Sequence, residues 1–258
     1  AIAEVRPAIV AHLAARSSVY EAASAPFEVW RSNVDATINL AKALSEHAPE
    51  AHLFFASSAE CYGATFASGA TLAEDAPLAP MNTYARSKTA AEYALRDLHV
   101  GGRLTTLRMF NQIGPGQDER FVSSSFAAQI ARIELGLQSP TMMVGDLSAE
   151  RDFCDVDDMI RALMMLIERR DTLDRCSTFN ICSGRARAIQ EILDILVGLS
   201  TVGVEVVVES ARLRPASIAR AAGSHEALTR AVGWRPEIPL EHTLERLLGH
   251  WRRALRTH

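Results

Sequence analysis

The sequence has few cysteines and no long apolar segment. Its four cysteines, Cys61, Cys154, Cys176 and Cys182, form no Cys-x-x-Cys pair and have no histidine at the spacing of a zinc site. We therefore expect buried free thiols and no metal site. No stretch approaches the roughly 18 apolar residues that cross a bilayer, and the first residues lack the pattern of a signal peptide. We predict a cytoplasmic protein that does not bind a membrane.

An excess of charge of either sign is also missing. The 258 residues carry a formal net charge of −4, and the pI is about 6.1. Such a chain is not suited to neutralising nucleic-acid phosphates, so nucleic acid is not an expected partner. Hydrophobic residues make up 48% and charged residues 22%, which is ordinary globular usage and argues against disorder, collagen and coiled coil. One large domain, or a domain with a smaller lobe, fits this length.

A third absence concerns the loop that normally opens a dinucleotide-binding sheet. No G-x-G-x-x-G or G-x-x-G-x-x-G follows a first strand in these residues. We expect that the chain begins inside such a domain and that about 50–60 residues precede Ala1, at roughly 30 residues per βαβ unit. On this expectation, the sequence lacks its main pyrophosphate-binding element.

Short apolar runs alternate with amphipathic stretches, which is the pattern of a parallel sheet with helices on its faces. After Asn111 a turn-rich segment loosens this alternation. We predict a doubly wound α/β domain over residues 1–112, and a smaller α/β lobe over residues 113–258 from which some segments return to the first sheet. Strands are predicted at Pro7–Ala15, His52–Ser58, Arg103–Phe110, Met142–Val144, Thr178–Cys182 and Val204–Val208, and helices at Glu28–His47, Asn82–Leu98, Val122–Leu135, Asp155–Glu168, Ile189–Leu199, Gly223–Val232 and Leu240–Leu255.

The sharpest local signal is a tyrosine and a lysine four residues apart, Tyr84 and Lys88, on a predicted helix. That spacing places both side chains on one helix face. An unperturbed tyrosine, with a pKa of about 10, is a poor acid-base catalyst at neutral pH, but a neighbouring ammonium favours the phenolate and lowers that pKa. We predict that Tyr84 donates or accepts the proton and that Lys88 tunes it. A solvated lysine beside a half-buried tyrosine has the same spacing, so the motif alone is weak.

The strand before this helix strengthens the functional interpretation. It ends in the residues S-S-A-E-C-Y-G, Ser57–Gly63, and ligands bind at strand carboxyl ends in open α/β sheets. The hydroxyl of Ser58 can bind the substrate oxygen that Tyr84 protonates. The structural alternative is a strand that simply ends in turn-forming serines.

Taken together, these segments resemble the extended short-chain dehydrogenase/reductase family, in its NAD-dependent epimerase/dehydratase branch, over nearly the whole chain. The residues H-L-A-A at 12–15 are similar to a family turn, and Asn33 is similar to a family asparagine. The resemblance implies a Rossmann-like fold that binds NAD or NADP. It also implies that the backbone of Leu13, Ala14 and Ala15 passes the cofactor and that Asn33 stabilises the active-site strand region.

The same resemblance assigns the catalytic roles. It makes Ser58 the ligand of the substrate oxygen, Tyr84 the acid or base, and Lys88 both the tuner and a contact of the cofactor ribose. Dehydratases of this branch also use a glutamate two residues after the catalytic serine or threonine as a base at the sugar ring. Glu60 occupies that position.

Three later residues match positions that hold the substrate in this family. Asn111 in R-M-F-N-Q-I-G-P implies a nucleotide-sugar contact, and Arg151 in R-D-F and Arg214 in R-P imply contacts to the diphosphate. A planar guanidinium suits this role because it matches phosphate oxygens bidentately. Apart from the family, each arginine is an ordinary surface ion-pair residue. An acidic residue usually follows R-P by two positions, where this sequence has Ser217.

The segments F-N-Q-I-G-P-G-Q, V-G-D-L-S-A-E-R-D-F and G-W-R-P-E-I-P-L-E-H-T-L most resemble reductases that convert GDP-4-keto-6-deoxy-D-mannose to GDP-D-rhamnose. A GDP-mannose 4,6-dehydratase is the first alternative, but its S-P-R-x-G is replaced here by residues 113–116. A nucleotide-sugar 4-epimerase is the next. A non-catalytic truncated relative, which binds a nucleotide sugar or only partners, also stays open because the glycine loop is absent.

The family commonly forms homodimers by packing the Tyr-Lys helix and its neighbour into a four-helix interface. Ala85, Ala90, Ala91 and Ala94 give the present helix small side chains that allow close packing. We therefore expect a homodimer, although these alanines can equally face the sheet.

Overall fold

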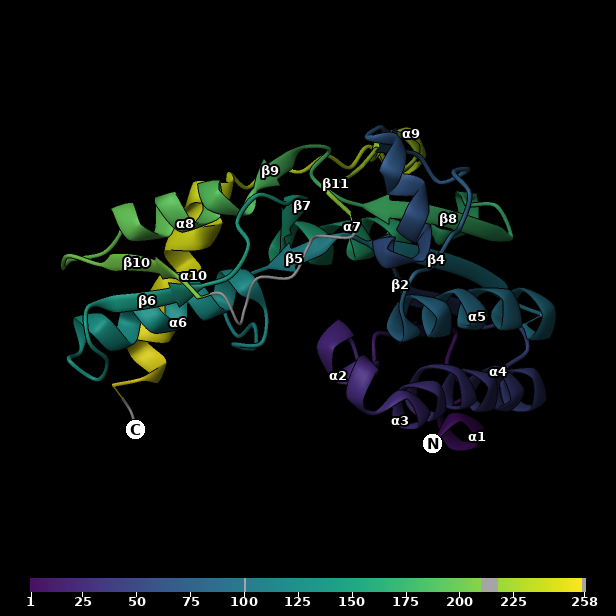
Figure 1. Ribbon diagram of the computed structural model, residues 1–258. Coiled ribbons are helices and arrows are strands. Elements are labelled where there is room, and N and C mark those ends of the chain that lie inside the picture. Colours follow the sequence, from purple (N-terminus) through teal and green to yellow (C-terminus); the bar gives the residue numbers. More distant parts are fainter. Residues whose placement is uncertain (100, 210–217, 257–258) are drawn as a thin grey trace. The chain divides into compact units, whose positions relative to one another are not determined.

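The computed structural model describes residues 1–99, 101–209 and 218–256, and the chain divides into two compact units. The chain passes between them several times, so neither unit is one continuous segment (Figure 1). The first unit comprises Ala1–Phe110, Ala162–Ile181 and Gly223–Arg235, and the second comprises Asn111–Arg161, Cys182–Ala222 and Pro236–His258.

The first unit is built on a four-stranded sheet in the order β1-β2-β4-β8, with the strands at Ile9–His12, His52–Ser58, Arg103–Met109 and Cys176–Ile181. Every pairing is parallel, so the carboxyl ends of all four strands meet at one edge of the sheet. All residues of β2 are buried, as expected for a strand with both faces covered.

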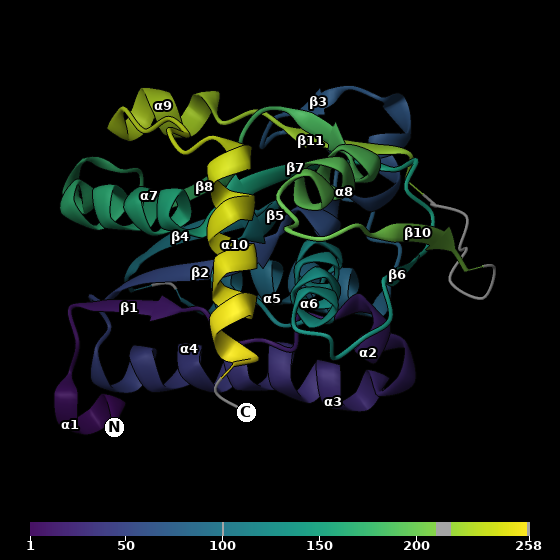
Figure 2. The same cartoon turned by 90° about the vertical axis from the view of Figure 1, so that its left-hand side faces the viewer.

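Helices cover both faces of this sheet. α4 (Ala36–His47) and α5 (Thr83–Leu98) lie on one face, and the part of α7 (Val156–Glu168) that follows Ala162 lies on the other (Figure 2). The predicted doubly wound α/β arrangement is therefore confirmed. A buried apolar cluster joins α4 and α5 to β2 and β4 and contains Ala41, Leu44, Leu53, Phe55, Ala91, Leu95 and Leu104.

α5 presents polar side chains to the interior of the unit. The helix begins after Asn82, whose side chain caps it by accepting a 2.8 Å hydrogen bond from the backbone N–H of Ala85. Tyr84, Lys88 and Glu92 then follow at four-residue intervals, and all three are buried. A helix stripe facing a core is normally apolar, so this polar stripe is an exception.

The remaining elements of the first unit are short. The predicted helix Glu28–His47 is helical throughout, but it contains a π-helical turn, η1 (Arg31–Asp35), between α3 (Pro26–Trp30) and α4. Such turns are frequent at functional sites, and this one carries Asn33. The others are α1 (Ile2–Val5), α2 (Val19–Ser24), η2 (Ala59–Ser68), β3 (Thr71–Leu72), η3 (Arg170–Thr172) and α9 (Glu226–Val232).

Three helices supply most of the core of the second unit: α6 (Val122–Glu134), α8 (Ile189–Gly198) and α10 (Leu240–Ala254). β6 (Thr141–Val144) and β10 (Glu205–Val208) form a parallel pair. β7 (Glu150–Asp155) pairs with β5 (Asn111–Ile113), β9 (Ala186–Ala188) and β11 (Arg220–Gly223). The buried core residues are Ile113, Phe126, Ala127, Ile130, Ala131, Ile133, Met142, Val144, Phe153, Ile192, Leu193, Leu196, Leu244, Leu247 and Leu248.

The sequence pattern did not predict β5, β7, β9 or β11. β7 begins with Glu150-Arg151-Asp152, which has the composition of a loop, yet Asp152 is wholly buried. Its carboxylate accepts hydrogen bonds from the backbone N–H and hydroxyl of Ser183, both at 2.7 Å, and from the N–H of Gly184 at 3.0 Å. These bonds offset the cost of burying the charge.

Candidate functional site

The structure brings Ser58, Tyr84 and Lys88 together in the first unit. Ser58 ends β2, and the other two residues lie on α5, which covers β2. The side chain of Ser58 acts to lower the pKa of Tyr84, and all three side chains are buried. The pairing of a strand end with one helix face is the arrangement that the sequence predicted.

Burial raises the pKa of Tyr84 to about 12, against the opposing effect of the hydrogen bond from Ser58. The net shift is therefore opposite to the expected fall, because desolvation of the phenolate is the largest effect. The tuning of Tyr84 by Lys88 stays a prediction. The phenol stays protonated at neutral pH.

The ammonium of Lys88 is also deeply placed, with 2% of the residue exposed. Burial lowers its pKa to about 8, while the charge of Glu92, one helical turn further along α5, acts in the opposite direction. The nitrogen lies 4.6 Å from the centre of the Phe55 ring, a favourable cation–π distance. At neutral pH, Lys88 is therefore a buried cation.

Asn33 ties the segment after β1 to the catalytic helix. Its side chain accepts a 2.9 Å hydrogen bond from the N–H of Arg16 and donates to the carbonyl of Arg16 at 3.1 Å and to the hydroxyl of Ser87 at 3.0 Å. β1 ends at His12, earlier than predicted, so Leu13, Ala14 and Ala15 leave the sheet at its carboxyl edge, with Leu13 and Ala14 exposed.

Glu60 is held beside the tyrosine by the cap of the catalytic helix. Its carboxylate accepts a 3.0 Å hydrogen bond from the side chain of Asn82, and its backbone N–H donates to the hydroxyl of Ser58 at 3.2 Å. The charge of Glu60 also contributes to the raised pKa of Tyr84. The site therefore contains a carboxylate, that of Glu60, in addition to the phenol of Tyr84.

Gly63 closes the S-S-A-E-C-Y-G segment with backbone angles of φ 47° and ψ −116°. A Cβ atom at this position would lie 1.9 Å from the carbonyl oxygen of Ala79, so both the conformation and the space require glycine. The approach is fixed by hydrogen bonds from Ala64 N–H to Ala79 O at 2.9 Å and from Ala79 N–H to Cys61 O at 3.1 Å.

The predicted substrate-binding residues lie in the second unit or outside the described residues. Asn111 is exposed at the start of β5. Arg151, on the neighbouring strand β7, is half-buried and donates to the carbonyl of Glu150 at 2.8 Å. The parallel register of the two strands pairs Asn111 with Phe153. Arg214 and Ser217 lie outside the described residues.

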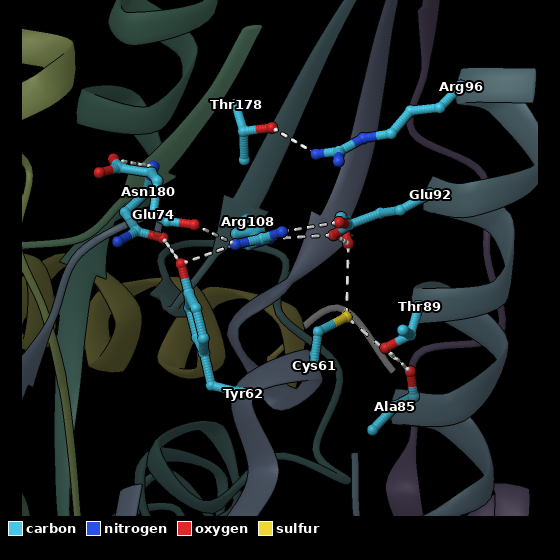
Figure 3. Close-up of polar contacts among 11 residues, drawn as sticks. Cys61, Tyr62, Glu74, Ala85, Thr89, Glu92, Arg96, Arg108, Thr178 and Asn180 are labelled. Carbon is cyan, nitrogen blue, oxygen red and sulfur yellow. Dashed lines mark hydrogen bonds and ion pairs between the residues drawn. The ribbon is translucent and has the colours of Figure 1, made fainter. Parts of the chain in front are cut away.

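The first unit also contains a buried polar network that was not predicted from the sequence. It links Glu92, Arg108, Tyr62 and Asn180, which come from α5, β4, η2 and β8 (Figure 3). One signal was available, because Glu92 follows Lys88 by four residues and therefore shares its helix face. Cys61 also lies in this region and is buried, whereas Cys176 is exposed, contrary to the expectation of four buried thiols.

A cavity of about 660 Å³ opens at the opposite edge of the same sheet, where β2 and β4 begin with His52 and Arg103. Arginine and carboxylate side chains both line it, so no charge dominates. It is separate from the Ser58 site. Among the described residues, no group of three His, Cys, Asp or Glu side chains could hold a metal ion, and no helix could span a membrane.

Known proteins are similar to this chain over most of its length. A GDP-6-deoxy-D-mannose reductase from Pseudomonas aeruginosa is 35% identical over 252 residues, which cover 97% of this chain and 82% of that protein. A UDP-glucose 4-epimerase from Corynebacterium glutamicum is 28% identical over 239 residues, covering 88% and 71%. A solved structure of RMD from Pseudomonas aeruginosa complexed with NADPH has a TM-score of 0.89 at 35% identity, covering 96% of this chain and 82% of that chain.

The family described as GDP-mannose 4,6 dehydratase matches residues 1–247. This match covers almost the whole chain, and it includes the H-L-A-A turn, the S-S-x-E-x-Y-G segment and the Y-x-x-x-K helix. The resemblance to the epimerase/dehydratase branch is confirmed, and the chain belongs to the GDP-mannose 4,6 dehydratase family.

Proposed function

We propose that this protein is an NAD(P)-dependent nucleotide-sugar reductase that converts GDP-4-keto-6-deoxy-D-mannose to GDP-D-rhamnose. The observation that carries the proposal is the placement of three buried side chains: Ser58 ends β2, and Tyr84 and Lys88 lie four residues apart on α5, which covers that strand. The 35% identity to a GDP-6-deoxy-D-mannose reductase supports the choice of substrate.

The reaction places a hydride on C4 of the sugar and a proton on its oxygen. Ser58 hydrogen-bonds the keto oxygen and orients it. Tyr84 then donates its phenolic proton to the developing alkoxide, which becomes the 4-hydroxyl group, and the phenolate that remains is stabilised by the positive charge of Lys88. A bound nicotinamide cofactor supplies the hydride.

The residues around Tyr84 fit such a cofactor. Lys88 presents a buried ammonium to hydrogen-bond ribose hydroxyls, and Leu13, Ala14 and Ala15 offer backbone and small side chains at the sheet edge where β1 ends. Asn33 fixes the segment that follows them. The proposal covers both NADP and NAD. We retain Asn111, Arg151 and Arg214 as proposed contacts of the nucleotide sugar.

Supplying the purified protein with NADPH or NADH and GDP-4-keto-6-deoxy-D-mannose should oxidise the cofactor, with one GDP-D-rhamnose formed per cofactor consumed. Absorbance at the nicotinamide band and chromatography of the product measure the two quantities. GDP-mannose in place of the keto sugar is the negative control. Absence of oxidation with both cofactors would overturn the proposal.

Glu60 supports a second candidate, the GDP-mannose 4,6-dehydratase, because its carboxylate is held by Asn82 at the start of α5 and its charge acts to raise the pKa of Tyr84. In that reaction Glu60 removes the C5 proton. GDP-mannose alone separates the two functions, since a dehydratase forms the 4-keto product without net oxidation of cofactor. The Glu60→Gln variant should lose a dehydratase activity and should retain most of a reductase activity.

We also propose that the protein is a homodimer that assembles through α4 and α5 and acts in the cytoplasm. Ala85 and Ala91 are buried within the unit, so they are not available to a partner, but Tyr93 is 56% exposed, and Ala90 and Ala94 are half-buried on the outer side of α5. A second copy would cover this apolar surface.

Sedimentation velocity at micromolar concentration should show a dimer for the unaltered protein and a monomer for Tyr93→Arg, because an arginine would be buried without a partner charge. Leu137→Arg, an exposed position in the second unit, is the matched control and should remain dimeric. A monomer for the unaltered protein would contradict the assembly.

A further inference from the structure

A buried carboxylate lies one helical turn beyond the predicted catalytic lysine. Glu92 is 2% exposed, and its oxygens accept hydrogen bonds from Nε of Arg108 at 3.2 Å and from Nη2 of Arg108 at 2.9 Å (Figure 3). The hydroxyl of Ser57 donates to the same carboxylate. A bidentate pair of this kind fixes both the orientation of the guanidinium of Arg108 and its distance from the carboxylate of Glu92.

The three partners come from the elements that form the catalytic site. Ser57 immediately precedes Ser58 on β2, and Arg108 lies directly opposite Ser57 on β4 in the parallel register. On α5, Glu92 lies about one turn after Lys88 and about two turns after Tyr84. The carboxylate therefore joins the helix that carries the phenol and the ammonium to the strand end that carries the serine.

Arg108 is itself held in place on its other side. Its Nη1 donates to the hydroxyl oxygen of Tyr62 at 3.1 Å and to the carbonyl of Glu74 at 2.9 Å, and the hydroxyl of Tyr62 donates to Asn180 at 2.8 Å. Burial acts to lower the pKa of Arg108, but the hydrogen bonds and charge of Glu92 raise it above its ordinary value. The guanidinium is therefore a fixed positive charge.

We propose that Glu92 is a positioning residue for the reaction: held by Arg108 and Ser57, it fixes α5 against the ends of β2 and β4, so that Tyr84 and Lys88 stay in place beside Ser58. The inference rests on the proposed roles of Tyr84 and Lys88. Glu92 acts only through these residues and does not itself touch the reacting atoms.

The same carboxylate also acts on the pKa of the lysine, against the larger effect of burial. Three groups on the packed elements interact with Lys88: His12 from β1, Cys61 from η2, and Glu92 from its own helix. Burial raises the pKa of Cys61 above its ordinary value, so this thiol is neutral at pH 7. Glu92, which pairs with Arg108, therefore remains as a group that acts to raise the pKa of Lys88.

The chain has two lysines, Lys42 and Lys88, which allows a direct measurement without substrate or cofactor. In protein labelled with ¹³C-lysine, the Cε signals of both residues can be followed by NMR as the pH is raised. For Glu92→Gln, the titration midpoint of Lys88 should fall by roughly one pH unit, as expected when a nearby opposite charge is removed. The midpoint of Lys42 should not change.

Glu46→Gln is the matched control, because Glu46 is the carboxylate four residues after the exposed Lys42 and lies 4.0 Å from it. This variant should leave the midpoint of Lys88 unchanged. An unchanged midpoint of Lys88 in Glu92→Gln would overturn the electrostatic part of the proposal. Because this measurement needs no turnover, it stays decisive even if the proposed reduction is not observed.

Glu92→Gln leaves Arg108 buried without its anion, which can unfold the protein. The double variant Glu92→Gln/Arg108→Met removes both charges and should recover most of the lost stability. Its kcat should fall at least about tenfold with little change in KM, since misplacement of a catalytic group reduces the rate rather than binding. A folded double variant with unaltered kcat would refute the positioning role.

Discussion

Replacing Tyr84 by phenylalanine is expected to lower kcat for the proposed reduction by about 10²–10⁴-fold, the usual contribution of one general acid. The substitution removes only the phenolic hydroxyl and leaves the buried ring in place. The protein should therefore remain folded. Initial rates of NADPH oxidation with saturating GDP-4-keto-6-deoxy-D-mannose measure the effect.

Tyr93 offers a matched control, because it lies on the same helix but is exposed to solvent. Tyr93→Phe removes the same atom and should keep the rate of the unaltered protein. A Tyr84→Phe variant that retains more than a tenth of the activity would show that another group supplies the proton. Glu60 would then be the first residue to test, since it lies beside the phenol.

Lys88→Met should make the protein more stable and less active. The pKa of Lys88 is lowered on folding, from 10.5 to about 8, so the folded protein binds this proton more weakly than the unfolded chain does. The resulting cost is about 3 kcal/mol at pH 7, at 1.36 kcal/mol for each pKa unit. A methionine of similar shape removes this cost.

The gain in stability expected for Lys88→Met depends on pH. The cost is fully present below about pH 8 and disappears as the pH rises toward 10.5, because the unfolded chain then loses its proton as well. Urea unfolding should show the variant more stable by about 3 kcal/mol at pH 7 and by less than about 1 kcal/mol at pH 10. Lys42→Met, at a side chain that is 74% exposed, should change neither value. A destabilised Lys88→Met would contradict the prediction.

The strongest sequence patterns predicted their elements well. β2 has the predicted bounds, and α5 begins one residue after the predicted start, because a continuous apolar run and a capping asparagine are unambiguous local signals. Ser58, Tyr84 and Lys88 could be found for the same reason. Their relation depends only on a strand end and on a four-residue helical spacing.

Features that depend on packing could not be predicted in the same way. The pKa of Tyr84 was expected to fall and instead rises, because desolvation depends on every neighbour and a motif gives only one of them. β7 was missed because its buried Asp152 is stabilised by Ser183 and Gly184, some thirty residues away in the sequence. The pairing of Glu92 with Arg108 is equally non-local.

The closure at Gly63 has a consequence for the loop that it begins. Hydrogen bonds between residues 61–64 and Ala79 fasten both ends of the intervening segment, much as the neck of an Ω-loop is fastened. The exposed tip at Ser68, Gly69 and Ala70 can therefore vary in length at a small entropic cost. Natural or engineered diversity in the length of this tip is thus compatible with the closed backbone at Gly63 and Ala79.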